Sequence, residues 1–165
     1  MQILSLIGLI LFILYNIGIL IINRGKCPVS VSETSYILQE KLGKKYSLFF
    51  TLICMIVAGT FLPLWMESTP DNFQFLVFLA CAGVLFAGST PFFREGLDKP
   101  IHYISGIIIA IAYILWFVFV GDCNWLFYTL CAIVITCLAV WSSRVWLYFV
   151  ELYGLIALAI FLIDQ

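Results

Sequence analysis

Long apolar stretches alternate with polar connections along the whole chain. Six stretches come close to or reach the roughly 20 mainly apolar residues that a helix needs to cross the hydrocarbon core of a bilayer. They are Ile3–Ile22, Ser47–Met66, Phe73–Phe93, Ile101–Val120, Trp125–Trp141 and Val145–Ile163. Their length and uniform apolarity exclude the alternating strands of a membrane barrel. The pattern predicts an all-α integral membrane bundle of six transmembrane helices in one domain, residues 1–165, with the first stretch a retained helix rather than a cleaved signal.

The first connection, Asn23–Tyr46, is the only long one. Ser30 and Glu33 have the spacing of a capping box, in which each side chain bonds a free amide at the start of a helix, and Gly43 supplies a stop. The sequence therefore predicts a short helix from about Val31 to Leu42. Its apolar residues and the nearby lysines favour a helix that lies on the cytoplasmic membrane surface, with a plain connector as the alternative.

The basic residues occupy alternate connections. All eight lie between the first and second, the third and fourth, or the fifth and sixth stretches: Arg24, Lys26, Lys41, Lys44, Lys45, Arg94, Lys99 and Arg144. Short basic connections stay in the cytoplasm, so both termini are expected outside it, in a membrane such as the bacterial inner membrane. The five tryptophans, Trp65, Trp116, Trp125, Trp141 and Trp146, fall near the ends of stretches, as in aromatic belts at both interfaces.

The composition agrees with lipid surroundings and excludes several classes of function. An apolar content of 64%, a charged content of 10% and a mean hydropathy of +1.15 lie outside the range of soluble domains. No basic stripe with interleaved aromatic residues indicates nucleic-acid binding. A single histidine and the lack of nucleotide-binding, serine-hydrolase and zinc-protease motifs predict no metal and no cofactor. The six cysteines contain no C-x-x-C pair and are interpreted mostly as packing residues.

A few strongly polar side chains lie within the predicted helices. A charged group at a helix centre costs about 2.5–3.5 kcal/mol in a bilayer, so it usually faces protein or water. Glu151 lies about two turns into the last stretch, and Asn16 sits at a similar depth in the first, so the two can meet if those helices are neighbours. His102 opens the fourth stretch, and histidine suits proton transfer near neutral pH. Because these groups gather in the cytoplasmic half, we expect a polar cavity there.

Cytoplasmic charges complete the candidate site, because Arg94 and Arg144 would attract an anionic group. Each residue also has a structural interpretation: Glu151 as a partner of Arg144, Glu33 as a helix cap, His102 as an interfacial hydrogen bonder, and the arginines as topology signals. The predicted ligand-binding residues are Glu151, His102, Asn16, Arg94, Arg144 and Glu33.

Small residues at helical spacing allow close approach of helices, within one chain or between subunits of a homo-oligomer. They are Ala80, Gly83 and Ala87 in the third stretch and Gly106 and Ala110 in the fourth.

Three runs, Ser32–Tyr36, Phe78–Gly83 and Pro100–Gly106, resemble those of uncharacterised six-span bacterial membrane proteins. The resemblance covers most of the chain and implies no activity. A fainter similarity to the DRAM-like membrane family rests on six spans, a polar first loop and a histidine near the start of span four, matched by His102. That family places its first loop on the opposite side of the membrane, so its biology is not transferred.

Three functional hypotheses remain open from the sequence. The leading one is a protein that binds or moves a small molecule or lipid through a cavity in the cytoplasmic half, with membrane lipids as its surroundings. The second is a cofactor-free membrane enzyme that uses His102 and a carboxylate as acid and base. The third is an oligomeric channel or structural subunit.

Overall fold

The chain folds into a bundle of long helices. The computed structural model describes residues 2–94, 96–120 and 145–164, and every regular element in these ranges is a helix. Five helices in the described ranges are long and apolar enough to cross a membrane: Gln2–Ile22, Lys44–Glu67, Asp71–Ser89, Asp98–Phe119 and Trp146–Ile163. The predicted all-α class is thus confirmed for the described residues. The predicted stretch Trp125–Trp141 lies outside them.

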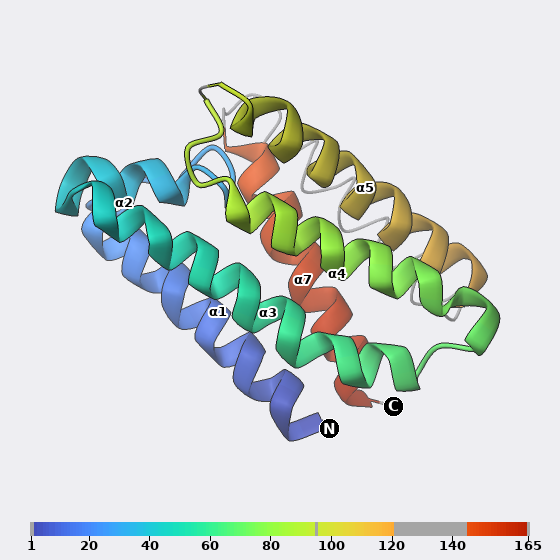
Figure 1. Cartoon of the computed structure of the whole chain (residues 1–165). Helices are drawn as coiled ribbons and strands as arrows, with labels where there is room; N and C mark the ends of the chain where they lie inside the picture. The colour runs from blue at the N-terminus through green and yellow to red at the C-terminus, as the bar shows by residue number, and fades with distance from the viewer. Residues whose placement is uncertain (1, 95, 121–144, 165) are drawn as a thin grey trace.

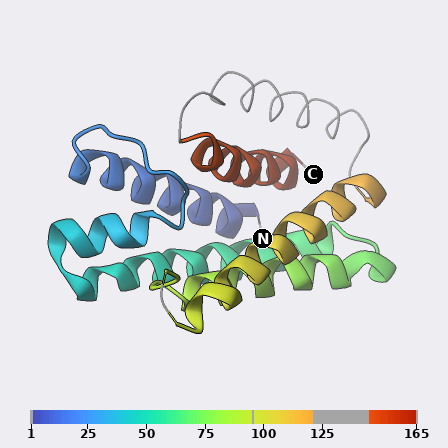
Figure 2. The same ribbon diagram turned by 90° about the horizontal axis from the view of Figure 1, so that it is seen from above.

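The helices pack in a chain of neighbours. In sequence order the elements are α1 (Gln2–Ile22), α2 (Thr34–Leu42), η1 (Lys44–Ser47), α3 (Leu48–Glu67), η2 (Asp71–Phe73), α4 (Gln74–Ser89), α5 (Asp98–Phe119) and α7 (Trp146–Asp164). Helix α3 packs between α1 and α4, α5 packs on α4, and α7 packs on α1 (Figures 1 and 2). Helices from opposite ends of the sequence, α1 and α7, therefore lie side by side.

The two ends of the bundle differ in chemistry. The chain termini and the α3–α4 connection lie at one end, and Gln2 Nε2 donates a hydrogen bond to the Ile163 carbonyl there at 3.4 Å. The first connection, α2 and the α4–α5 connection lie at the other, which we name the α2 end (Figure 1). Every lysine and arginine of the described residues belongs to the α2 end.

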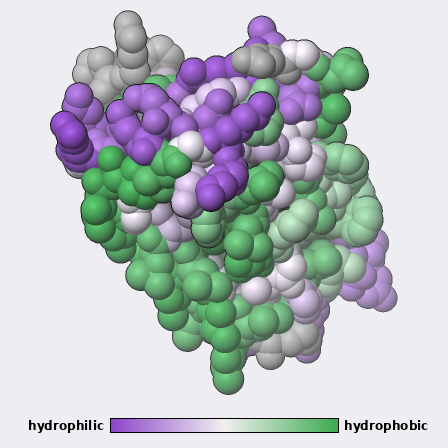
Figure 3. Space-filling view, turned by 60° about the vertical axis from the view of Figure 1, so that its left-hand side comes forward, coloured by the Kyte–Doolittle hydropathy of each residue, from purple (hydrophilic) through white to green (hydrophobic). Residues whose placement is uncertain are grey.

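The flanks of the bundle carry exposed apolar side chains. Phe78 is 62% exposed on α4 and Ile107 is 59% exposed on α5. In Figure 3 hydrophobic residues cover most of the visible flank, and hydrophilic residues gather toward the top of the view. Large apolar surfaces of this kind are unfavourable in water and suit contact with lipid.

Several helix boundaries differ from the sequence prediction by up to four residues; α5, for example, begins at Asp98 rather than at Ile101. Helix α4 ends at Ser89 rather than at Phe93, because Pro91 lacks an amide hydrogen and disfavours helical geometry in Thr90 before it. Helix α2 begins at Thr34 rather than at Val31, since residues 31–33 form turns. It ends where predicted, with Gly43 at φ 114°.

The tryptophan-belt interpretation is wrong for two of the five tryptophans. Trp65 is 4% exposed and Trp116 is 0% exposed, and their rings pack edge to face with centroids 5.4 Å apart. Trp116 Nε1 donates to Thr69 Oγ1 at 2.8 Å. These rings belong to the core, because their large apolar surface packs among other aromatic residues such as Phe117 and Phe161.

Glycine allows close helix contact only where a neighbouring helix faces it. A Cβ added to Gly83 would lie 2.6 Å from Ile109 Cγ1 and 3.2 Å from the Ser105 carbonyl on α5, whereas Gly106 meets nothing within 4 Å among the described residues. On α1, a Cβ at Gly8 would collide with Thr60 on α3 and lie 3.3 Å from Phe61 Cε2. The same addition at Gly18 meets nothing within 4 Å.

This contrast on α1 gives a matched test of the packing. Gly8→Ala should destabilise the protein by about 1–3 kcal/mol, because the added methyl group overpacks the α1–α3 contact. Gly18→Ala makes the same change without a neighbour and should leave stability unchanged or slightly raised. Thermal unfolding in detergent, followed by tryptophan fluorescence, measures both; equal transition temperatures for the two variants would contradict this packing.

Candidate functional site

One polar segment, Val29–Tyr36, runs across the α2 end and contacts most of the helices there. Its residues bond in turn to α7, α5, the α4–α5 connection and α1. The segment places short hydroxyl side chains between helices that are far apart in the sequence. It therefore organises the polar interior of this end of the bundle.

Glu151 of α7 holds the beginning of this segment. Its Oε2 accepts a hydrogen bond from the Val31 backbone N–H at 2.6 Å. One turn earlier, the Tyr148 backbone N–H donates to the Val29 carbonyl at 3.0 Å, which satisfies a free amide at the start of α7. The half-buried carboxylate thus has a backbone partner in the segment.

Asn16 lies on the neighbouring face of α1. Its Oδ1 accepts from the Tyr148 hydroxyl at 3.0 Å, and its Nδ2 donates to the Phe12 carbonyl at 2.8 Å. Asn16 and Glu151 therefore belong to adjacent helices but bond to different partners. The Tyr15 and Thr34 hydroxyl oxygens lie 2.6 Å apart, which adds a second link between α1 and the segment.

The predicted capping box forms only in half. Ser30 Oγ accepts from the Glu33 N–H at 3.1 Å, as expected of a cap. Glu33 does not return the bond to Ser30; its carboxylate forms an ion pair with Arg94 in the α4–α5 connection. In a complete capping box Glu33 would accept from the backbone N–H of Ser30. The next amide along the chain, that of Val31, donates to Glu151 of α7.

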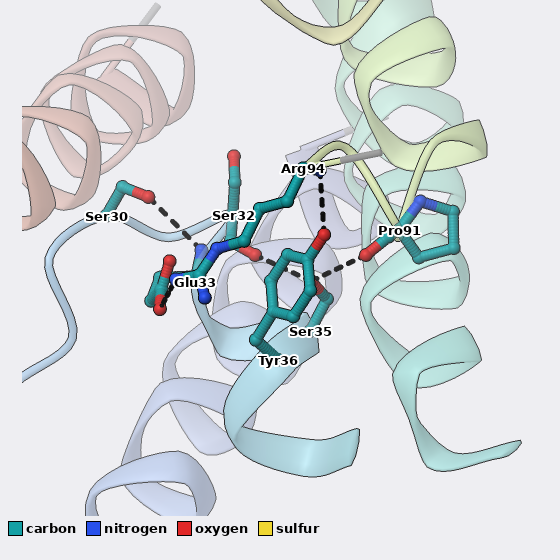
Figure 4. A network of polar contacts seen from close by, with 7 residues as sticks. All are labelled: Ser30, Ser32, Glu33, Ser35, Tyr36, Pro91 and Arg94. Carbon is teal, nitrogen blue, oxygen red and sulfur yellow. Dashed lines mark hydrogen bonds and ion pairs between the residues drawn. The ribbon is translucent and has the colours of Figure 1, made fainter. Parts of the chain in front are cut away.

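Arg94 completes a clamp between the segment and the α4–α5 connection. Its guanidinium lies over the Tyr36 ring, 4.2 Å from the centroid, and its backbone N–H donates to the Tyr36 hydroxyl at 2.8 Å. Ser35 Oγ donates to the Pro91 carbonyl at 2.9 Å. Figure 4 shows Arg94 reaching across Tyr36 toward Glu33, with Ser35 behind the Tyr36 ring. The Arg94 side chain keeps 55% of its surface exposed and is accessible to an anion.

His102 sits in the first turns of α5 and is 7% exposed. Its Nε2 lies 2.9 Å from Ser32 Oγ, and its Nδ1 lies 3.1 Å from both the Ala87 carbonyl and Thr90 Oγ1. The Phe93 ring stacks on the imidazole with centroids 4.1 Å apart. Both ring nitrogens are therefore engaged, and the ring plane is fixed.

The partners of His102 determine its tautomer. The Ala87 carbonyl can only accept, so Nδ1 must carry a hydrogen. Thr90 agrees, because its hydroxyl donates to the Ala87 carbonyl at 3.0 Å and is left to accept from the ring. In the neutral imidazole Nε2 then has a lone pair, and the Ser32 hydroxyl donates to it.

A hollow of about 510 Å³ opens beside this cluster, between α2 and the α4–α5 connection. It is lined by Tyr36, Gln39, Lys44, Phe92, Gly96, Leu97 and Asp98. The Lys44 ammonium lies 5.0 Å from the centre of the Phe92 ring. The lining therefore combines one cation, one carboxylate and two aromatic rings.

The structure divides the predicted site residues into two clusters joined by the Val29–Tyr36 segment. Glu151 and Asn16 lie beside α1 and α7, while His102, Glu33 and Arg94 lie beside the α4–α5 connection. Arg144 lies outside the described residues. In the described part of the chain, no group of three metal-ligating side chains comes together.

Sequence reasoning missed the partners that hold the candidate residues. Ser32, Thr90 and Tyr148 bond directly to His102 or Asn16. Ser32 and Thr90 were signalled only by the density of hydroxyl residues in the first connection and at the end of the third apolar stretch, and Tyr148 only by its position three residues before Glu151.

The Glu151 contact gives a direct test of this arrangement. Glu151→Ala removes the acceptor of the Val31 N–H and should destabilise the protein by about 1–3 kcal/mol, whereas Glu151→Gln keeps an acceptor oxygen and should cost less. Glu67→Ala, at an exposed glutamate on the other end of the bundle, is the control for loss of a carboxylate. Thermal unfolding in detergent measures all three, and equal losses in the Gln and Ala variants would count against the hydrogen bond.

Comparison of the chain with protein-family models, curated proteins and solved structures finds no match.

Proposed function

We propose that the chain is a six-span protein of a bacterial inner membrane, with both termini outside the cytoplasm and α2 on the cytoplasmic surface. The collection of basic residues at the α2 end supports this orientation, since basic connections stay in the cytoplasm. The five described apolar helices supply all but one of the spans. In this proposal the stretch Trp125–Trp141, which lies outside the described residues, is the remaining span.

Reporter fusions test this topology. Alkaline phosphatase fused after the last residue should be active, because it folds only outside the cytoplasm, and a green fluorescent protein at the same place should stay dark. The opposite pattern is expected for fusions truncated within the first connection, after Glu40. A fluorescent, phosphatase-negative C-terminal fusion would overturn the proposed orientation.

The protein, in our proposal, binds a small molecule or lipid that carries an anionic group, at the cytoplasmic end of the bundle. The observation that carries this function is the hollow beside α2, which combines Lys44 with two aromatic rings next to the exposed guanidinium of Arg94. Ammonium and guanidinium groups bind phosphate and carboxylate strongly. The polar end of an amphiphile would enter the hollow, and its apolar part would lie on the exposed flank.

Glu151, Asn16 and His102 support this site rather than line it. Their polar atoms bond to the Val29–Tyr36 segment or to Tyr148. They thereby fix Tyr36, which forms one wall of the hollow. Arg144 stays a predicted second cation, and movement of the ligand across the membrane and assembly into an oligomer also stay predictions.

Ligand-induced stabilisation tests the binding proposal. Dihexanoyl phosphatidylglycerol should raise the transition temperature of the purified protein in detergent more than dihexanoyl phosphatidylcholine does, because only the former has a net negative headgroup. Lys44→Gln should weaken the apparent affinity about tenfold, as expected for loss of one charged contact of roughly 1.5 kcal/mol.

Lys41→Gln provides the matched control. It removes the same charge from α2, but Lys41 is paired with Glu40 at 2.7 Å and is not part of the hollow. Equal stabilisation of the wild type, Lys44→Gln and Lys41→Gln proteins would eliminate the hollow as the binding site.

A further inference from the structure

We propose that Ser32 and His102 form a nucleophile–base pair that cleaves an acyl ester of a membrane lipid. This activity goes beyond the binding function proposed above and does not depend on the hollow. It rests on the atoms that surround the imidazole. No carboxylate of the described residues takes part in the proposed reaction.

The geometry supplies an activated hydroxyl. Ser32 Oγ lies 2.9 Å from His102 Nε2, within the distance over which a general base removes a proton. The hydrogen on Nδ1, held by the Ala87 carbonyl and Thr90 Oγ1 at 3.1 Å each, leaves the Nε2 lone pair for Ser32. A nucleophile, a base and a group that orients the base are the three parts of a covalent hydrolase site.

The surroundings distinguish Ser32 from the other hydroxyl residues of the segment. Thr34 donates to the Val31 carbonyl at 2.5 Å and Ser35 donates to the Ser32 and Pro91 carbonyls at 2.9 Å, so both hydroxyl hydrogens are used by backbone acceptors. Ser32 instead donates to a basic nitrogen. It is also half-buried, whereas Thr34 and Ser35 are 0% exposed.

Hydrogen-bond donors next to Ser32 can stabilise the oxyanion that acyl transfer forms. The Ser32 backbone N–H is in no hydrogen bond to the described residues, and it precedes the first turn of α2. The Arg94 guanidinium is bound to Glu33, the next residue along the chain, and is largely exposed. Backbone N–H groups and guanidinium groups both stabilise the oxyanion of a tetrahedral intermediate.

The reaction follows from these roles. As Ser32 Oγ bonds to the ester carbonyl carbon, His102 Nε2 takes the hydroxyl proton and the carbonyl oxygen becomes an oxyanion. When the oxyanion collapses, the bond to the ester alkoxy oxygen breaks, and His102 gives that oxygen its proton to release an alcohol. Water then attacks the acyl-serine with His102 again as base, which releases a carboxylic acid and restores Ser32. A neutral carbonyl stabilises the imidazolium less than a carboxylate would, so slow turnover is expected.

The apolar surroundings point to a lipid as the source of the ester. Ile101, Tyr103 and Ile104 form the outward face of α5 at the level of the buried His102, with 42%, 56% and 56% of their surfaces exposed, and Leu97 before the helix is 81% exposed. An acyl chain can lie against this face of α5 while its ester group reaches the polar end of the helix. A soluble ester would gain nothing from these contacts.

A fluorophosphonate probe tests the pair, because it phosphonylates serines that have an adjacent base. The intact purified protein in detergent should be labelled, the label should map to Ser32 by mass spectrometry, and labelling should increase with pH as the imidazole loses its proton. Ser32→Ala should abolish labelling, and His102→Gln should slow it about 100-fold or more. Ser35→Ala removes a hydroxyl from the same segment without removing the nucleophile, so it should still be labelled.

Each outcome decides the proposal. A cooperative thermal unfolding transition establishes that each variant is folded. Labelling of the wild-type protein tests the proposal even if a variant does not fold. A wild-type protein that stays unlabelled between pH 6 and 9, or a folded Ser32→Ala protein that is labelled as fast as the wild type, overturns it. Release of fatty acid from diacyl phospholipid in mixed micelles, lost in Ser32→Ala, would extend the result from the probe to the lipid.

Discussion

A hydrogen bond between a carboxylate and a backbone amide fixes the α2 end of this bundle. Glu151 lies on the last helix and Val31 in the first connection, 120 positions apart in the sequence. With Val31 held on α7, Ser32 faces α5, Glu33 faces the α4–α5 connection and Thr34 faces α1. A shift of one residue would place the Glu33 carboxylate against the imidazole and leave Arg94 without its partner. The register of the whole segment therefore depends on this contact.

The segment also resolves the problem of irregular backbone beside an apolar bundle. Backbone amides and carbonyls outside a helix are costly unless they find partners, and here many of these partners come from other helices. The Val29 carbonyl accepts from the Tyr148 N–H, and the Val31 N–H donates to the Glu151 carboxylate. The Pro91 carbonyl accepts from the Ser35 hydroxyl. Once these bonds are made, Ser32 is the hydroxyl residue of the segment that contacts the imidazole of His102. Structural and chemical roles are thus divided among neighbouring residues of the same kind.

An aromatic wall separates the hollow from the imidazole. The Phe93 ring stacks on His102 with centroids 4.1 Å apart and meets the Tyr36 ring edge to face at 5.1 Å. Tyr36 in turn lines the hollow and lies under the Arg94 guanidinium. The proposed binding site and the proposed nucleophile are therefore connected through the packed rings of Tyr36 and Phe93, although different atoms carry each proposal. A ligand that moves Tyr36 would also change the packing on His102.

The sequence by itself determined the local features: the apolar lengths of the helices, the end of α2 at Gly43, the Ser30 half of the cap, and the identities of His102 and Glu151 as the polar groups that need an explanation. These features follow from hydrophobic length and from backbone chemistry over a few residues. Only the tertiary structure decided that Trp65 and Trp116 pack in the core, that Glu33 pairs with Arg94, and that His102 meets Ser32. These partners lie on segments far apart in the sequence, 61 positions for the ion pair and 70 for Ser32 and His102. Hydropathy sets which segments enter a membrane but not which helices become neighbours, and a polar side chain takes its role from its neighbour.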